Sequence, residues 1–165
     1  MISPPRGLEE IKKVYGDIVV SKLDGKRVII SPRYWEDRNM LVVRDLPGFE
    51  GRPLYINRLI EQPLRAALTG ATIRRPDYKI RTLGCFNPRQ KRTNGAELSL
   101  HSWGVAVDLN ADANPLVRLK HETDTFECDI PNEWIEEFKR CGFTWGGEFR
   151  GLTKDPQHFQ WASAY

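Results

Sequence analysis

The sequence has little cysteine, and the cysteines it has do not form a recognisable framework. Three of its 165 residues are cysteine, at Cys85, Cys128 and Cys141, and no Cys-x-x-Cys motif occurs. An odd, widely spaced set argues against a disulfide framework and against a zinc site built from thiolates. We expect Cys141 to pack as a small core residue on the apolar face of a helix.

Long apolar runs are also absent. No run approaches the roughly 18 residues that a membrane-spanning helix needs, so we expect no membrane insertion. The first residues, Met-Ile-Ser-Pro-Pro-Arg, lack the apolar core of a signal peptide, which predicts synthesis in the cytoplasm. Repeats and Gly/Ser-rich linkers are missing too. With 40% hydrophobic residues the chain can bury a core, and we expect a single domain over residues 1–165 and a monomer.

A strong excess of one charge is lacking as well. The net charge is +3, which is too small to indicate a nucleic-acid partner. The distribution is uneven, however: residues 71–92 hold seven basic side chains against one acidic one, whereas residues 121–165 hold nine acidic against four basic. The basic stretch could steer an anionic partner toward the protein, or it could be a solvated, loop-rich surface.

The pattern of apolar and turn residues predicts an α+β fold. Helical spacing covers residues 8–15, 57–68 and 132–141, and we expect the second of these helices to end before Gly70, with Pro63 in its first turn or at a kink. Strands are expected around an Asp-Gly hairpin turn and at several later short runs. Helices and strands are grouped along the sequence and do not strictly alternate, which favours a small antiparallel sheet flanked by helices. The predicted strands are residues 18–20, 27–30, 40–43, 104–109, 143–145 and 158–161. Residues 81–98 are polar, with several glycines and prolines, and are expected to form a long functional loop.

Two of the three histidines stand in unusual surroundings. His101 precedes an apolar run that ends at Asp108, and His158 follows Asp155 by three residues. A carboxylate within an apolar strand is costly unless it is paired or bound to a cation. His101 and Asp108 alone could form a buried hydrogen-bonded pair. Together with His158 they make a two-histidine, one-carboxylate set, which is typical of catalytic zinc. His121 lies in a charged segment and is expected to be exposed and idle.

These residues also stand in a recognisable order. Ser99-Leu-His-Ser-Trp-Gly-Val-Ala-Val-Asp108, followed by Gly-Gly-Glu-Phe and then Asp155-Pro-Gln-His158, resembles the family of zinc D-Ala-D-Ala carboxypeptidases and L-alanyl-D-glutamate peptidases. These enzymes cleave peptidoglycan peptides and share their fold with the Hedgehog signalling domain. The resemblance covers about residues 81–161, half of the chain. It implies a Hedgehog/DD-peptidase-like fold.

The resemblance also implies roles for individual residues. His101, Asp108 and His158 are implied as zinc ligands and Asp155 as the catalytic carboxylate. Glu148 is a second candidate for the base. An aspartate at position 155 is typical of the branch that contains phage endolysins and L-alanyl-D-glutamate endopeptidases, whereas the other branches usually have glutamate.

Substrate binding is predicted for a second group of residues. The segment Gly84-Cys-Phe-Asn-Pro-Arg89 resembles the family loop whose arginine holds the substrate carbonyl or carboxylate, a role that suits a planar guanidinium. Arg81 and Arg92 are the alternative candidates for this role. Arg89 could instead be a solvent-exposed loop residue without a role in binding. The hydroxyl group of Ser99 could form a hydrogen bond with the substrate or with the metal-site carboxylate, or it could stabilise a backbone turn. One of Trp103 and Trp145 is expected to line the cleft, with core packing as the alternative for each.

The sequence thus predicts a zinc metallopeptidase acting on the peptide stem of peptidoglycan, and the aspartate at position 155 favours an L-alanyl-D-glutamate endopeptidase of the phage-lysin type. Such a lysin would reach the cell wall at lysis or within the virion. Two alternatives stay open: a D-Ala-D-Ala carboxypeptidase of the same fold, and a non-catalytic metal-binding or interaction domain.

Overall fold

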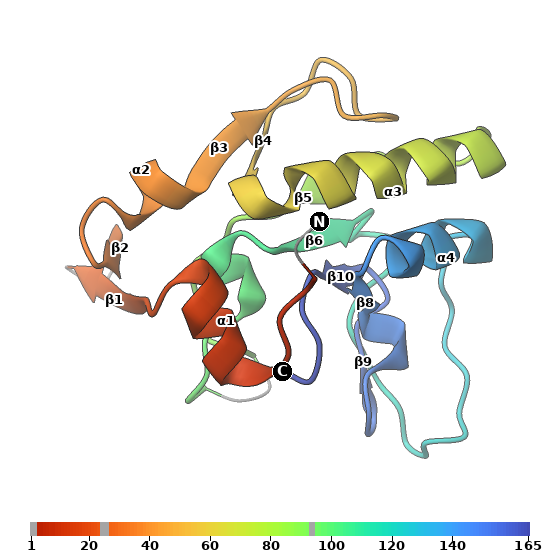
Figure 1. Cartoon of the computed structure of the whole chain (residues 1–165). Coiled ribbons are helices and arrows are strands. Elements are labelled where there is room, and N and C mark those ends of the chain that lie inside the picture. Colours follow the sequence, from red (N-terminus) through yellow and green to blue (C-terminus); the bar gives the residue numbers. More distant parts are fainter. Residues whose placement is uncertain (1–2, 24–26, 93–94) are drawn as a thin grey trace.

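The structure is a computed structural model that describes residues 3–23, 27–92 and 95–165. These residues form four α-helices, α1 (Gly7–Tyr15), α2 (Trp35–Asn39), α3 (Glu61–Arg74) and α4 (Asn132–Arg140), and small antiparallel sheets (Figure 1). The predicted α+β class is therefore confirmed. Within the described part of the chain, no helix is both long and apolar enough to cross a membrane.

A four-stranded antiparallel sheet forms the centre of the fold. Its order is β5 (Leu83–Gly84), β6 (Ala106–Leu109), β10 (His158–Gln160) and β8 (Thr144–Trp145). Side chains alternate between the two faces of a strand. Val107 and Phe159 therefore face the hydrophobic side, while Asp108 and His158, which are cross-strand partners, face the other side. The register brings together two residues that are 50 positions apart in the chain.

Three two-stranded ribbons complete the sheet structure. The predicted hairpin is present as β1 (Val19–Leu23) and β2 (Arg27–Ser31), although its Asp-Gly turn lies outside the described residues. The strand predicted over residues 40–43 is confirmed as β3 (Met40–Val43), and it pairs with β4 (Leu54–Asn57). The third ribbon, β7 (Val117–Arg118) with β9 (Thr153–Lys154), was not predicted, because two-residue strands carry no periodic signal.

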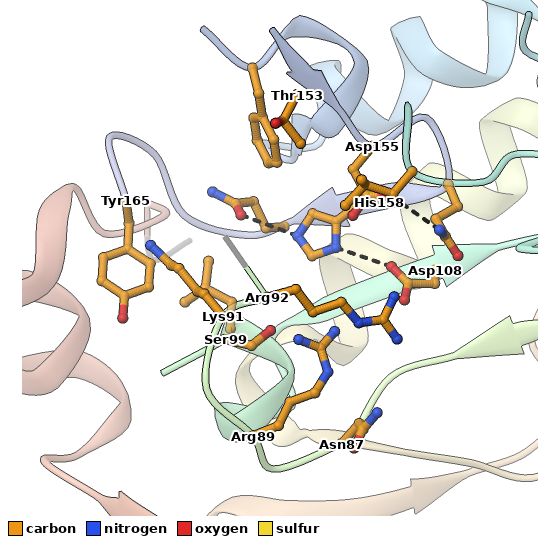
Figure 2. A pocket seen from close by; sticks show the side chains of 15 residues that line it. Asn87, Arg89, Lys91, Arg92, Ser99, Asp108, Thr153, Asp155, His158 and Tyr165 are labelled. Carbon is orange, nitrogen blue, oxygen red and sulfur yellow. Dashed lines mark hydrogen bonds and ion pairs between the residues drawn. The ribbon is translucent and has the colours of Figure 1, made fainter. Parts of the chain in front are cut away.

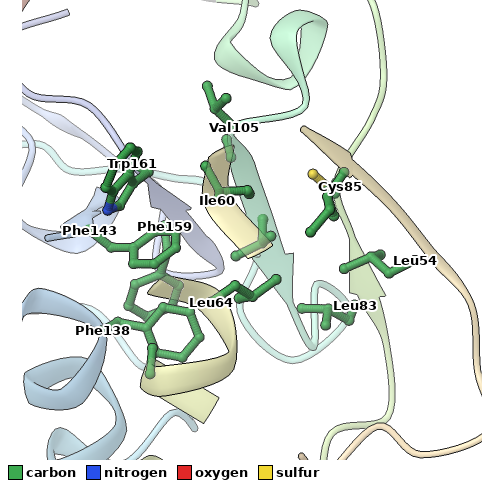
Figure 3. Packing of buried hydrophobic residues seen from close by; sticks show 14 of the residues in the cluster. Leu54, Ile60, Leu64, Leu83, Cys85, Val105, Phe138, Phe143, Phe159 and Trp161 are labelled. Carbon is green, nitrogen blue, oxygen red and sulfur yellow. The ribbon is translucent and has the colours of Figure 1, made fainter. Parts of the chain in front are cut away.

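Helices α3 and α4 cover the hydrophobic face of the sheet and pack against each other (Figure 1). Ile60, directly before α3, and Leu64, in its first turns, are fully buried beside Phe138 of α4 and Phe159 of β10 (Figure 3). The rings of Phe138 and Phe159 lie 4.4 Å apart between their centroids. This packing fixes one face of β10, so that its other face is held toward the functional site.

The predicted end of the second helix was wrong. A 3-10 turn, η1 (Arg58–Ile60), precedes α3, Pro63 lies in the first turn of α3, and the helix continues through Gly70 to Arg74. Gly70 serves a close approach of two helices: a Cβ atom there would collide with the carboxylate of Glu137 on α4. A glycine inside a helix costs about 0.5–1 kcal/mol relative to alanine, and here the close packing of α3 against α4 offsets that cost.

Candidate metal centre and its cavity

The predicted ligands meet at one point. His101 lies in the 3-10 turn η2 (Leu100–Trp103), and its Nε2 is 3.1 Å from Oδ1 of Asp108. His158 Nδ1 is 3.0 Å from the same oxygen and 3.2 Å from His101 Nε2. Metal–ligand bonds of about 2.0–2.1 Å in a tetrahedral site separate the ligand atoms by about 3.3 Å. The spacing of the three atoms therefore fits one zinc ion.

In each imidazole, the ring nitrogen that points away from Asp108 already forms a hydrogen bond. The other ring nitrogen is therefore the one that would bind the metal. His101 Nδ1 donates to the backbone carbonyl of Cys85 at 2.6 Å, which leaves Nε2 free to bind a cation. His158 Nε2 donates to Oε1 of Gln160 at 3.2 Å, which leaves Nδ1 free. Partners of this kind fix the tautomer and orientation of metal-binding histidines. Gln160 was missed, although it lies two residues after His158 and therefore on the same face of the strand.

Asp108 is ionised in this arrangement. Burial alone would raise the pKa of its carboxyl group, but the hydrogen bonds from His101 and His158 outweigh that effect and hold the pKa well below its usual range. One carboxylate oxygen and two imidazole nitrogens form a suitable donor set for a divalent metal, which on binding would replace the hydrogen bonds between them. Among the described residues, this is also the only group of three histidine, cysteine or carboxylate side chains with ligand atoms close enough to hold one ion.

A cavity of about 240 Å³ opens beside this centre. Figure 2 shows Arg89 and Arg92 on one wall and Thr153 and Asp155 on the other, with Asp108 and His158 between them. Ser99 also lines the cavity, as does Phe149, whose ring centroid lies 5.8 Å from that of His158. We call this space the main cavity.

Asp155 is held at the cavity wall by its own loop. Its backbone N–H donates to the carbonyl of Gly146, its carbonyl accepts from the N–H of His158, and its Oδ1 accepts from Gln157 at 3.1 Å. A Cβ atom at Gly146 would collide with the Asp155 carbonyl, so a glycine is needed there. Burial raises the pKa of the Asp155 carboxyl group, although the nearby His158 acts in the opposite direction. A raised pKa suits a group that must accept and then release a proton.

Arg89 reaches the same cavity from a loop that is bonded to η2. The backbone N–H of Asn87 donates to the carbonyl of His101 at 3.1 Å, and that of Ser99 donates to the carbonyl of Arg89 at 2.9 Å. The Nε atom of Arg89 is buried and has no hydrogen-bond partner. Burial, and then the charge of Arg92, lower the pKa of its guanidinium. Arg89 lines the cavity that adjoins the metal centre, where its guanidinium is suited to a carbonyl or carboxylate of a ligand.

The alternative candidates for the base and for the substrate-binding arginine differ in whether they line the main cavity. Glu148 pairs with Lys139 at 2.5 Å and does not line the main cavity, so it is poorly placed to act as the base. Arg81 pairs with Asp129 at 2.9 Å, also outside the cavity. Arg92 does line the cavity, so it stays a candidate beside Arg89. His121 is exposed, as expected.

One of Trp103 and Trp145 was expected to line the cleft, but neither lines the main cavity. Trp103 is 1% exposed, and its Nε1 donates to the carbonyl of Gly16, which places it in the core. This is a correction to a role for Trp103 in direct substrate contact. Trp145 is half-buried, and its Nε1 donates to the carbonyl of Pro156 at 2.7 Å. Trp145 thus supports the loop between Asp155 and His158 instead of forming the cavity wall.

Two histidines and a carboxylate around one point, with a half-buried carboxylate and an arginine at the adjoining cavity, define a metallopeptidase-type site. Residues 92–161 match the family model described as D-alanyl-D-alanine carboxypeptidase, and this segment contains the whole predicted ligand set. Over this segment the chain is similar to that family of peptidoglycan metallopeptidases, whose members have the Hedgehog/DD-peptidase fold, and the resemblance seen in the sequence is confirmed there. Searches of curated proteins and of solved structures found no match.

Proposed function

We propose that the protein is a zinc-dependent endopeptidase that hydrolyses the L-alanyl-D-glutamate bond in the peptide stem of peptidoglycan, as a lysin of phage type. The observation that carries the proposal is Asp155, a half-buried carboxylate in the wall of the cavity that adjoins the His-Asp-His set. Aspartate at this position resembles the endopeptidase and endolysin branch of the family.

Each group in the site has a role that follows from its position. Bound zinc would lower the pKa of a water molecule toward neutrality and polarise the scissile carbonyl. His101, Asp108 and His158 would hold the ion, with Cys85 and Gln160 orienting the imidazoles. Asp155 accepts the proton of the attacking water and then donates it to the leaving amine. The guanidinium of Arg89 holds the substrate carbonyl or carboxylate.

A D-Ala-D-Ala carboxypeptidase is the second candidate, and the description of the matching family model favours it. The two activities release different products from the same substrate. Purified sacculi should be digested with the protein and the fragments identified by mass spectrometry. The endopeptidase produces new amino termini at D-glutamate, whereas the carboxypeptidase releases free D-alanine and leaves the stem joined to the glycan.

The same digestion tests the class of reaction. New reducing sugars in place of new amino termini would identify a glycosidase and reject the peptidase proposal. Sacculi that bind the zinc-loaded protein but stay intact would support a non-catalytic wall-binding domain instead. We place the action of the enzyme at the cell wall, reached at lysis or from the virion, and clearing of permeabilised bacteria by the purified protein tests that setting.

A further inference from the structure

The main cavity continues into a second hollow. We call this the distal groove, and it is lined by Arg92, Leu116, Arg118 and Thr153. Three of these residues, all except Arg118, also line the main cavity. The two spaces therefore share a wall, and a ligand that occupies the main cavity can extend into the distal groove without crossing the core.

The β7–β9 ribbon fixes the position of the distal groove. Arg118 on β7 is the cross-strand partner of Thr153 on β9, and Thr153 precedes Asp155 by two residues. An extended chain rises about 3.3 Å per residue, so the backbone of Thr153 lies within about 7 Å of the backbone of Asp155. That length matches two residues of an extended peptide. The groove is therefore placed to receive a substrate group two residues away from the bond that is cleaved.

The charge of the distal groove is unbalanced. Lys91, at the edge of the main cavity, pairs with Glu97 at 2.6 Å, and its ammonium lies 3.5 Å from the centroid of the Tyr165 ring. By contrast, no acidic side chain of the described residues forms an ion pair with Arg92 or Arg118. Two unpaired guanidiniums in one groove favour a carboxylate, because each can donate two parallel hydrogen bonds to it.

We propose that the distal groove is a second substrate subsite that binds a free carboxylate two residues beyond the scissile bond. Arg118 and Arg92 contact the carboxylate, and Leu116, which is 38% exposed, contacts the aliphatic part of the same side chain. The proposal rests on the proposed endopeptidase activity and names a specificity that the activity alone does not require. Arg118 is the residue that tests it, because Arg118 lines the distal groove but not the main cavity.

The experiment uses the full chain loaded with zinc and two synthetic stem tetrapeptides. They differ only at the third residue, two positions beyond the L-alanyl-D-glutamate bond, which carries either a side-chain carboxylate or the matching carboxamide. The wild type should show a KM for the carboxylate peptide that is about 3–10-fold lower, with kcat unchanged within about twofold, as expected for a charge-assisted contact in a partly solvated groove. Arg118→Ala should abolish most of that preference, and Arg118→Lys should restore part of it.

A matched control is Arg58→Ala, which removes an exposed arginine on η1, outside both cavities, and should leave the preference unchanged. Equal KM values for the two peptides in the wild type would overturn the subsite while the endopeptidase activity stands. An unchanged preference in Arg118→Ala would do the same. Hydrolysis of neither peptide would overturn the proposed function itself, and with it the subsite that rests on it.

Discussion

The hydroxyl group of Ser102 bonds the backbone of Arg89 in both directions. Its Oγ accepts from the N–H of Arg89 at 2.9 Å and donates to the carbonyl of Arg89 at 2.8 Å. Ser102 is fully buried and directly follows His101, so the loop that carries the arginine is bonded to the turn that carries a metal ligand. This buried hydroxyl group therefore adds to the backbone hydrogen bonds of Asn87 and Ser99 in fixing the position of Arg89 relative to the metal centre.

The first prediction concerns this pair. Arg89→Ala should lower kcat/KM by an amount equivalent to roughly 2–4 kcal/mol, in the range of a lost preorganised donor, and Arg89→Lys should recover little because the planar fork is gone. Ser102→Ala should lower kcat/KM less, and its effect should largely vanish in the Arg89→Ala background because both changes act on the same guanidinium. Steady-state kinetics of the wild type, Arg89→Ala, Ser102→Ala and the double variant measures the coupling between the two residues.

The control for that cycle is Thr69→Ala. Thr69 also donates its hydroxyl to a backbone carbonyl, that of Arg65, but within α3 and away from the cavity. Its effect on kcat/KM should be small and independent of Arg89. Full activity in Arg89→Ala would transfer the substrate-binding role to Arg92, the other arginine that lines the main cavity.

The second prediction concerns the metal. The purified protein should hold about one zinc per chain, measured by elemental analysis. His101→Ala and His158→Ala should each lose both zinc and activity, because each removes one of three protein ligands. His121→Ala is the matched control, since His121 is exposed and lies outside the ligand group, and it should keep both. A preparation that stays fully active after chelation and dialysis would contradict the zinc mechanism.

The site residues that could be predicted from the sequence are those that lie a few positions apart in the chain. His158 and Asp155 belong to one loop and strand, and His101 and Asp108 belong to one turn and strand, so short-range patterns could name all four. Their meeting depends on the pairing of Asp108 with His158, a long-range register that only the resemblance could indicate. Ser102 could not be singled out, because a buried polar residue carries no sequence signal of the partner it will bond, whereas Gln160 could have been found from its two-residue spacing from His158.

Misjudged features share a physical cause. The end of α3 was wrong because Gly70 resembles a helix terminator, whereas its lack of a side chain is needed for contact with α4. Trp103 was one of two tryptophans expected near the cleft, and its side chain is instead buried in the core, the alternative that had been left open. In both cases tertiary packing decided between two roles that a single residue type can fill.

The third prediction concerns stability at low pH. Burial alone would raise the pKa of Asp129, but hydrogen bonds from Asn114, Arg81 and Tyr78 outweigh it and lower the pKa. A depressed folded-state pKa stabilises the protein above the unfolded value of about 3.9, and that stabilisation is lost as the pH falls through the folded value. Asp129→Asn should therefore be less stable than the wild type at pH 7, with a smaller gap near pH 3.

Urea denaturation at the two pH values measures that gap. The side chain of Asp129 is 36% exposed, so solvent screens its charge and the gap at pH 7 should be about 1 kcal/mol or less. Glu122→Gln removes a carboxylate from the exposed segment before Asp129 and should follow the wild type at both values. A gap that stays constant or widens toward pH 3 would show that the lost interaction does not depend on the charge of Asp129.

The last prediction separates an enzyme from a metal-binding module, and it depends on Asp155. This carboxylate lines the cavity but is not among the three grouped ligands, so its removal should leave the metal in place. Asp155→Asn keeps the size of the side chain but cannot accept a proton. Because general-base catalysis contributes about 10²–10⁴-fold, kcat should fall by about that much.

Zinc content, thermal stability and hydrolysis should be measured on the same Asp155→Asn sample. We expect zinc and stability near the wild type with hydrolysis nearly lost, while Glu148→Gln, which removes the exposed partner of Lys139, should keep its activity. Loss of zinc together with activity would make Asp155 a ligand. Retention of both would place the base elsewhere. A wild type that binds zinc and wall peptides without any turnover would identify a binding module. The substitution would then have no activity to abolish, since a proton acceptor in the cavity wall matters only when a bond is broken.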